Sequence, residues 1–281
     1  MIADVLNIYL ADRVPAQARP KEAASRIIRL AEYFGTGTLD SITGPACRAY
    51  TRQRSSQAAA RRELEDLRAA IIHHRREGLC NQIVEVILPE RSQPRERWLT
   101  RSEAARLLRT AWRRSPHVAR FILVGLYTGS RSGAILGASL TAVTGKGWVD
   151  LNKGVFYRKA FGAARTKKRQ PPVPIPDRLL AHMRRWQAKG HCKKALIEFD
   201  GAPILRITKA FDRAVEAAGL GDGVTPHTLR HTAATWMVEN GVETADVAKF
   251  LGMTEAMVED RYGHIGSKAL ARAAEGLTRR K

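Results

Sequence analysis

The sequence predicts a mostly helical protein of two domains, with a small antiparallel β-sheet in the second domain. Apolar residues recur at helical spacing through residues 1–88, a charged segment follows at 89–97, and strand-like residues are confined to 147–176. The 281 residues, 44% of them apolar, suffice for two hydrophobic cores. We therefore expect a helical domain at 1–88, a linker at 89–97 and an α+β domain at 98–281.

Four helices are expected in the first domain. Their predicted positions are 2–10, 21–34, a short stretch after Gly44-Pro45, and 56–76. The first presents apolar residues at i, i+3 and i+4, which is the spacing of a face turned to a core. Proline suits the first turn of the third helix, because its missing N–H has no partner there in any case.

The linker and the start of the second domain are marked by composition. Residues 89–97 hold two prolines and five charged residues but no apolar side chain, which is typical of a linker. Thr100-Arg-Ser-Glu103 fits a helix capping box. The apolar run 121–127 then predicts a buried helix that ends near Gly129.

A change in pattern after Gly147 predicts the sheet. Residues 148–151 and 155–158 flank a turn at Asn152-Lys-Gly154, as in a hairpin. The segment 170–176 contains prolines and is therefore compatible only with an edge strand. From Asp177 onward the patterns are helical again.

The charge of the chain indicates a polyanionic partner. There are 48 Lys and Arg against 27 Asp and Glu, a formal net charge of +21. Residues 1–98 hold 16 basic and 12 acidic side chains, a net +4, whereas 99–281 hold 32 and 15, a net +17. The attraction to nucleic acid should therefore reside mainly in the second domain.

Cysteine usage and hydropathy predict that the protein stays in the cytoplasm. Cys47, Cys80 and Cys192 are far apart and form no CxxC pair, which argues against zinc and against a disulfide framework. No run of 18 or more apolar residues exists, and the N-terminus begins with an amphipathic pattern rather than a signal peptide. We expect no membrane association.

Four residues suggest chemistry on a phosphodiester without a metal. They are Arg131, His227, Arg230 and Tyr262. Two guanidiniums can bind the non-bridging oxygens of a phosphate, and a phenol can supply the attacking oxygen. His227 precedes Arg230 by three residues and so shares its helix face.

The segments around these residues resemble the tyrosine recombinases, also called phage integrases. Thr128-Gly-Ser-Arg131 resembles the first arginine box of that family, and the run from His227 to Ala233 resembles the second. Leu251-Gly-Met253, followed nine residues later by Tyr262, resembles the nucleophile segment. The three boxes occur in the family's order.

The resemblance implies a fold and a reaction. Members of the family close a helical core-binding domain and a catalytic domain like a clamp around duplex DNA. Tyr262 would attack the scissile phosphorus to form a 3′-phosphotyrosine, with Arg131 and Arg230 on the phosphate and His227 moving a proton. The family's hairpin lysine, which protonates the leaving 5′-oxygen, is best matched by Lys167, with Lys168 as a rival.

The resemblance also implies partners. Recombination joins two duplexes through four subunits, so a homo-tetramer on double-stranded DNA is expected, with accessory DNA-bending or directionality proteins, in the nucleoid of a bacterial cell. No cofactor and no metal are expected. The tail, residues 267–276, has helical spacing and would pack either on a neighbouring subunit or on its own domain.

Two positions depart from the family's usual pattern. Ala134 occupies the place of a usual Glu or Asp, and Met253 that of a usual His or Trp. Methionine has no hydrogen to donate to a phosphate oxygen. His231 or His264 is a candidate substitute for the missing donor.

These departures keep other functions open. One alternative is a catalytically impaired DNA-binding homologue, and another is an enzyme that uses the same chemistry only to relax supercoils, as type IB topoisomerases do. His227 and His231, at i and i+4, also resemble a metal-binding pair, but no Glu follows His227 and no third ligand is evident.

Overall fold

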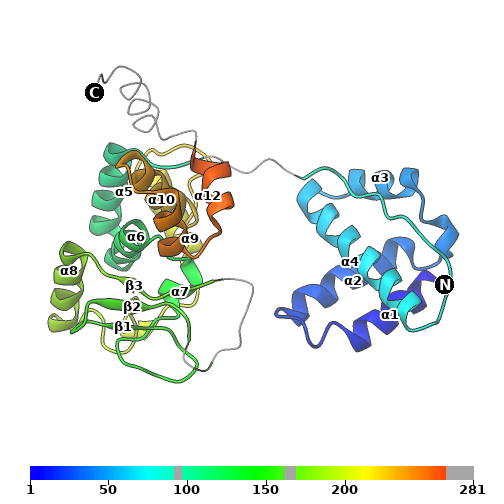
Figure 1. Cartoon of the computed structure of the whole chain (residues 1–281), viewed down its shortest axis with the longest axis horizontal. Helices are drawn as coiled ribbons and strands as arrows, with labels where there is room; N and C mark the ends of the chain where they lie inside the picture. Colours follow the sequence, from blue (N-terminus) through cyan, green and yellow to red (C-terminus); the bar gives the residue numbers. More distant parts are fainter. Residues whose placement is uncertain (92–96, 161, 163–168, 264–281) are drawn as a thin grey trace, which may run out of the picture. The chain divides into compact units, whose positions relative to one another are not determined.

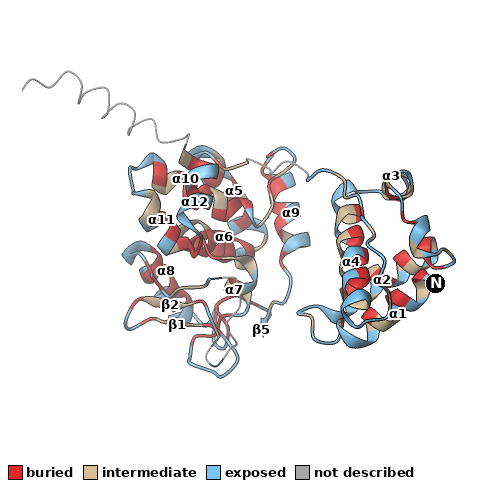
Figure 2. Ribbon diagram, turned by 45° about the vertical axis from the view of Figure 1, so that its right-hand side comes forward, coloured by how far each residue is buried: buried red, intermediate tan, exposed pale blue. Residues whose placement is uncertain are grey.

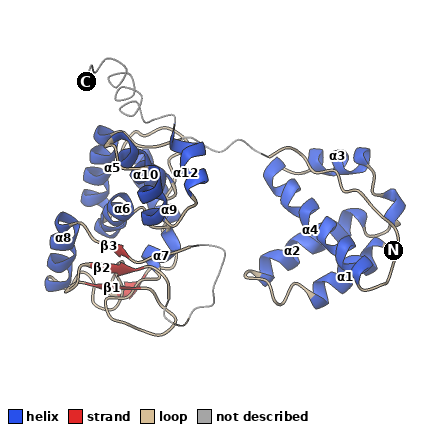
Figure 3. Ribbon diagram, viewed as in Figure 1, coloured by secondary structure: helices blue, strands red, loops and turns tan. Residues whose placement is uncertain are grey.

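The computed structural model describes residues 1–91, 97–160, 162 and 169–263, and it divides into two compact units, Met1–Pro94 and Arg95–Lys281 (Figure 1). Each unit has its own hydrophobic core. Both units are dominated by helices, and the strands lie in the second (Figure 3). The predicted fold class, mostly helical with small antiparallel sheets, is confirmed.

The first unit consists of helices. Their bounds are α1 Ile2–Asp12, α2 Pro20–Phe34, the 3-10 turn η1 Leu39–Ser41, α3 Gly44–Gln53 and α4 Gln57–Arg76. All four predicted helices are present, and the predicted face of the longest is buried in the core through Leu64, Leu67 and Ile71. Proline occupies the first turn of both α2 and α3, as expected for a residue that lacks an N–H.

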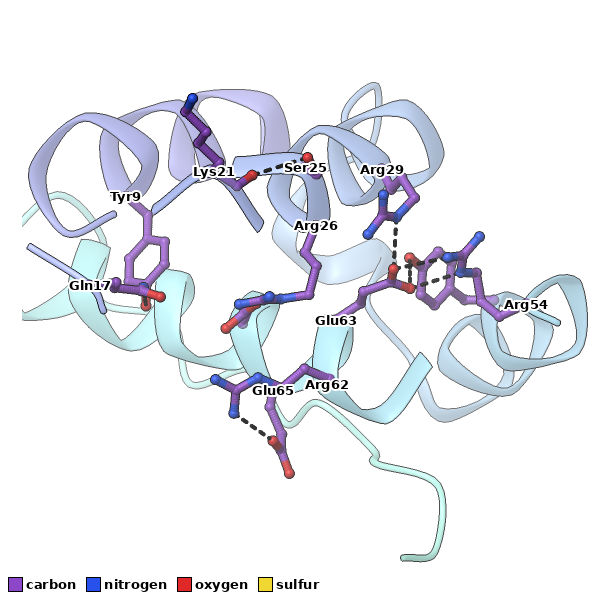
Figure 4. A network of polar contacts seen from close by, with 12 residues as sticks. Tyr9, Gln17, Lys21, Ser25, Arg26, Arg29, Arg54, Arg62, Glu63 and Glu65 are labelled. Carbon is purple, nitrogen blue, oxygen red and sulfur yellow. Dashed lines mark hydrogen bonds and ion pairs between the residues drawn. The ribbon is translucent and has the colours of Figure 1, made fainter. Parts of the chain in front are cut away.

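A buried carboxylate joins three of these helices. Glu63 on α4 is only 1% exposed, and it accepts hydrogen bonds from Arg29 on α2 at 2.8 Å and from Arg54 at 2.8 and 3.0 Å (Figure 4). The hydroxyl of Tyr50 on α3 donates a further one at 2.8 Å. Burial raises the pKa of Glu63, but these donors outweigh it and lower the pKa below its usual value. The carboxylate is therefore paired despite its burial.

The second unit holds eight helices within the described residues. They are α5 Arg101–Arg114, α6 Pro116–Thr128, α7 Ser132–Leu136, α8 Asp177–Ala188, α9 Thr208–Ala217, α10 Thr228–Glu239, α11 Thr244–Leu251 and α12 Glu255–Tyr262. The capping box predicted at Thr100 and Glu103 is present at the start of α5. Helix α6 contains the predicted apolar run and ends at Thr128, and the chain turns at the next residue, Gly129, with φ 56°.

The predicted hairpin and edge strand form one antiparallel sheet. Strands β1 (Trp148–Asp150), β2 (Val155–Tyr157) and β3 (Val173–Pro174) lie in that order, with β3 at an edge. Helix α8 lies beside this sheet (Figure 1). A second hairpin, β4 (Glu198–Phe199) with β5 (Ala202–Pro203), was not predicted, because strands of two residues show no periodicity.

The buried hydrophobic residues of the second unit form two clusters. Figure 2 shows the buried residues of the protein in red. The larger one centres on α6, whose residues 118–125 are all buried. The smaller one joins α10, α11 and α12 and includes Met253, Val258 and Tyr262. It holds the end of α12, and hence Tyr262, against α10.

Within the described residues, no helix is both long and apolar enough to span a membrane.

Candidate active site

The turn after α6 positions Arg131. The hydroxyl of Thr128 donates to the carbonyl of Val124 at 2.6 Å and lies 2.8 Å from the hydroxyl of Ser130. Gly129 adopts a left-handed conformation, and a Cβ there would lie 2.2 Å from Leu251. Arg131 then begins α7, and its Nη1 donates to the carbonyl of Arg169 at 3.1 Å.

Arg230 ties the same turn to two other helices. It lies on α10, is only 4% exposed, and donates to the carbonyl of Gly129 at 2.9 Å and to that of Leu251 at 2.7 Å. Because these carbonyls lie at the ends of α6 and α11, one guanidinium fixes all three elements. The guanidiniums of Arg131 and Arg230 lie near enough for the charge of Arg131 to lower the pKa of Arg230.

A third arginine, Arg158, belongs to this cluster and was missed by the sequence analysis. It follows β2 and is 4% exposed, with Nε donating to the carbonyl of Pro171 at 2.9 Å and Nη2 to that of Phe250. Phe156 and Arg158 are both buried and two residues apart, so both point to the inner side of the strand. That period of two was the available signal, which we interpreted only as part of a hairpin.

The cluster carries positive charge without a matching carboxylate. Among the described residues, no Asp or Glu forms an ion pair with Arg131, Arg158 or Arg230. Burial, followed by repulsion from Arg230 and Arg131, lowers the pKa of Arg158 to about 9. Burial and the charge of Arg131 lower that of Arg230 to about 10. Such a cluster is suited to binding an anion.

His227 lies at the start of α10, beside the arginines. The side chain of His227 is exposed, yet the surrounding protein reduces its hydration. This loss of hydration, followed by the positive charges of Arg230, Arg131 and Arg261, lowers the pKa of His227. The imidazole of His227 is therefore neutral near pH 7 and can exchange a proton. Its ring lies 4.7 Å, centroid to centroid, from that of His231.

Tyr262 ends α12 and is only 4% exposed. Its hydroxyl lies 2.6 Å from Nδ1 of His231, one turn after His227 on α10. Burial raises the pKa of Tyr262, while the nearby charges of Arg261 and Arg230 act in the opposite direction. The phenol is thus close enough to Arg230 to respond to its charge, as a nucleophile at that phosphate site would be.

The remaining candidates have different outcomes. Met253 is 9% exposed and packs in the apolar cluster of Tyr262, whereas Ala134 lies on the half-buried helix α7. The predicted residues Lys167, Lys168 and His264, and the tail 267–276, lie outside the described residues. In the described part of the chain, no group of three potential metal ligands comes together, so His227 and His231 have no third partner there.

The family model named Phage integrase family matches residues 97–268. The chain belongs to the phage integrase family. The match covers the whole arginine cluster and Tyr262, which agrees with the resemblance seen in the three sequence boxes. It also begins close to residue 95, where the second compact unit starts.

Individual integrase-family relatives align over short segments. The chain is 34% identical to tyrosine recombinase XerC of Corynebacterium glutamicum over 68 residues, which are 24% of this chain and 22% of that protein. It is 31% identical to tyrosine recombinase XerD of the same organism over 91 residues, 32% of this chain and 30% of the relative. The chain thus spans less than a third of the length of these relatives.

Solved integrase structures share the fold over nearly the whole chain. The Tn1549 transposon integrase in complex with transposon right end DNA matches with a TM-score of 0.77 at 16% identity, covering 97% of this chain and 99% of that one. The lambda integrase bound to DNA matches with a TM-score of 0.71 at 19% identity, covering 93% and 96%.

Proposed function

We propose that the chain is a site-specific DNA recombinase that integrates or excises a mobile element through a 3′-phosphotyrosine intermediate. The observation that carries this proposal is the cluster of three arginines, which has no carboxylate partner among the described residues, beside the buried phenol of Tyr262. A phosphodiester supplies the missing negative charge, and the phenol supplies a nucleophile. Membership of the phage integrase family supports the same chemistry.

In the proposed reaction, DNA binds to the basic second unit, and the first unit acts as a helical core-binding domain. The guanidiniums of Arg131 and Arg230 bind the non-bridging oxygens of the scissile phosphate. The oxygen of Tyr262 attacks phosphorus, the bond to the 5′-oxygen breaks, and that oxygen takes up a proton for which Lys167 is the proposed donor. The covalent bond keeps the phosphoester energy, so the strand can be rejoined without ATP.

We propose that four subunits act together on two duplexes in the bacterial cytoplasm, with accessory DNA-bending or directionality proteins. A tetramer of lambda integrase is known on a Holliday junction, and that protein shares this fold with a TM-score of 0.70. The two alternatives are less favoured. A DNA-binding homologue without activity has no need of a phenol buried beside arginines, and no observation favours supercoil relaxation over strand exchange.

The test uses a nicked duplex that carries the sequence the protein itself selects from random DNA. After cleavage the short strand diffuses away, so a covalent protein–DNA adduct should accumulate and survive denaturing electrophoresis. We expect Tyr262→Phe to abolish the adduct while binding stays within about twofold, because the hydroxyl is needed for chemistry rather than for affinity. Tyr127→Phe, at a tyrosine outside the cluster, is the matched control. An undiminished adduct with Tyr262→Phe refutes the assignment.

A further inference from the structure

The hydroxyl of Tyr262 contacts a histidine other than the one that the sequence analysis assigned to proton transfer. Its oxygen lies 2.6 Å from Nδ1 of His231, within the range of a strong O–H···N hydrogen bond. The contact joins α12 to α10 across 31 residues of sequence. His227 has no hydrogen bond to the phenol among the described residues.

The contact is held by packing on both sides. Tyr262 is 4% exposed and belongs to the apolar cluster of α10, α11 and α12, together with Val258 and Met253. His231 is half-buried and lies edge-on against the ring of His227. Tyr262 cannot move away from His231 without disturbing this cluster, so the phenol is held in position for a transfer between these two atoms.

We propose that His231, through Nδ1, accepts the phenolic proton of Tyr262 as the tyrosine attacks the scissile phosphate. This inference rests on the proposed function and assigns one step within it. The O–H bond of Tyr262 breaks and an N–H bond forms at Nδ1, which leaves an imidazolium. At the same time the Tyr262 oxygen bonds to phosphorus and the 5′-oxygen departs, taking its proton from a separate donor. In rejoining, the imidazolium returns the proton to the departing tyrosine oxygen.

The charges that face His231 link this step to DNA binding. Burial, then His227, Arg261 and Arg230, lowers the pKa of His231 to about 4. At neutral pH the imidazole is therefore uncharged, and the proton stays on the phenol, whose pKa is raised by burial. A bound phosphate adds negative charge beside Arg230 and Arg261, which favours the imidazolium. Proton transfer should thus become easier when the substrate is in place.

His231→Asn is the sharpest test, because Oδ1 of asparagine lies as many bonds from Cα as Nδ1 of histidine. The amide can accept the phenolic hydrogen bond but cannot take the proton. We expect single-turnover cleavage of the selected nicked duplex to slow by about 10²-fold, a typical contribution of a general base. DNA binding should remain within about twofold. His191→Asn, at an exposed histidine elsewhere on the unit, should cleave at the wild-type rate.

Two further measurements separate a base from a structural contact. The cleavage rate of the wild type should fall on the acid side as imidazole becomes protonated, and the His231→Asn variant should lack this limb. A duplex with sulfur in place of the scissile 5′-oxygen has a leaving group that needs no proton, so it should not rescue His231→Asn. Rescue by sulfur would show that His231 serves the leaving group and would overturn the inference.

The outcomes also distinguish the inference from the function on which it rests. If the wild type forms no covalent adduct, the proposed function fails and the inference with it. If the wild type forms the adduct and His231→Asn forms it at an unchanged rate, only the inference fails. A variant that is slow but keeps the acid limb of the wild type would assign His231 a purely structural role, which also overturns the proposal.

Discussion

Arg131, Arg158 and Arg230 repel one another, and a bound anion relieves that repulsion. The pKa values of all three are lowered by burial, and those of Arg158 and Arg230 are lowered further by their arginine neighbours. Arg158 and Arg230 remain charged near pH 7, because their pKa values are about 9 and about 10. The protonated cluster therefore costs folding free energy in the absence of an anion, and an anion that binds it should stabilise the native state.

We expect inorganic phosphate to raise the thermal midpoint of the second unit more than chloride at equal ionic strength. Phosphate at roughly ten times its Kd adds about 1.4 kcal/mol to the free energy of unfolding. Tryptophan fluorescence reports this transition selectively, since all five tryptophans lie within 98–236. Arg230→Gln should remove the difference in thermal midpoint between phosphate and chloride. Lys249→Gln, at an exposed lysine, should preserve this difference. Equal midpoints in phosphate and chloride would count against an anion site.

Met253 has a structural explanation that its place in the sequence did not suggest. The family's usual donor is absent there, and the thioether instead fills the apolar cluster around Tyr262. We expect Met253→Leu, which conserves volume, to cleave the nicked duplex at nearly the wild-type rate. Met253→Ala should lower the free energy of unfolding by about 2–5 kcal/mol, measured in urea, because it leaves a cavity. A large rate loss with Met253→Leu at unchanged stability would instead assign the sulfur a direct role.

Helices α2, α3 and α4 depend on a single buried carboxylate. Glu63→Gln keeps the shape but removes the charge that Arg29 and Arg54 share, and we expect a loss of about 1–3 kcal/mol in unfolding free energy. The pKa of Glu63 is lower in the folded state than in the unfolded state. The contribution of its carboxylate to the free energy of unfolding is therefore present above the unfolded pKa of about 4.3, and it is lost as the pH falls through the folded pKa. Hydrogen exchange of residues 57–76 at several pH values measures this. The difference in unfolding free energy between the wild type and Glu63→Gln should disappear in acid. A difference that does not change with pH would contradict a stabilising role for the charge of Glu63.

Most helices and strands could be predicted from patterns among neighbouring residues. The features that were not predicted depend on contacts between residues that are distant in sequence. The periods of helices and strands, the caps and the Asn152-Lys-Gly154 turn depend on neighbouring residues, so α1, α6 and the β1–β2 hairpin could be predicted. The bond between His231 and Tyr262 joins two helices, and no sequence spacing encodes it. Arg158 was missed because its carbonyl partners, Pro171 and Phe250, are distant in sequence. The role of Lys167 remains a prediction.

At the scale of the whole molecule, charge is divided unequally between the two units. Residues 1–98 carry a net +4 and residues 99–281 a net +17. Each phosphate neutralised on duplex DNA contributes a slope of roughly −0.9 to the dependence of log affinity on log salt, because condensed counterions are released. The second unit has its own core and can be prepared separately as residues 95–281.

We expect the 281-residue chain to bind duplex DNA with a slope of about −5 to −9, equivalent to roughly six to ten phosphates. The isolated second unit should bind more weakly but keep most of the slope, because it holds most of the positive charge. Fluorescence anisotropy with labelled duplex over 50–300 mM salt measures both. Tyr262→Phe should leave the slope unchanged, since it alters no charge. A flat salt response would contradict DNA binding by this charge, and a slope lost with the first unit would assign the main phosphate contacts to that unit instead.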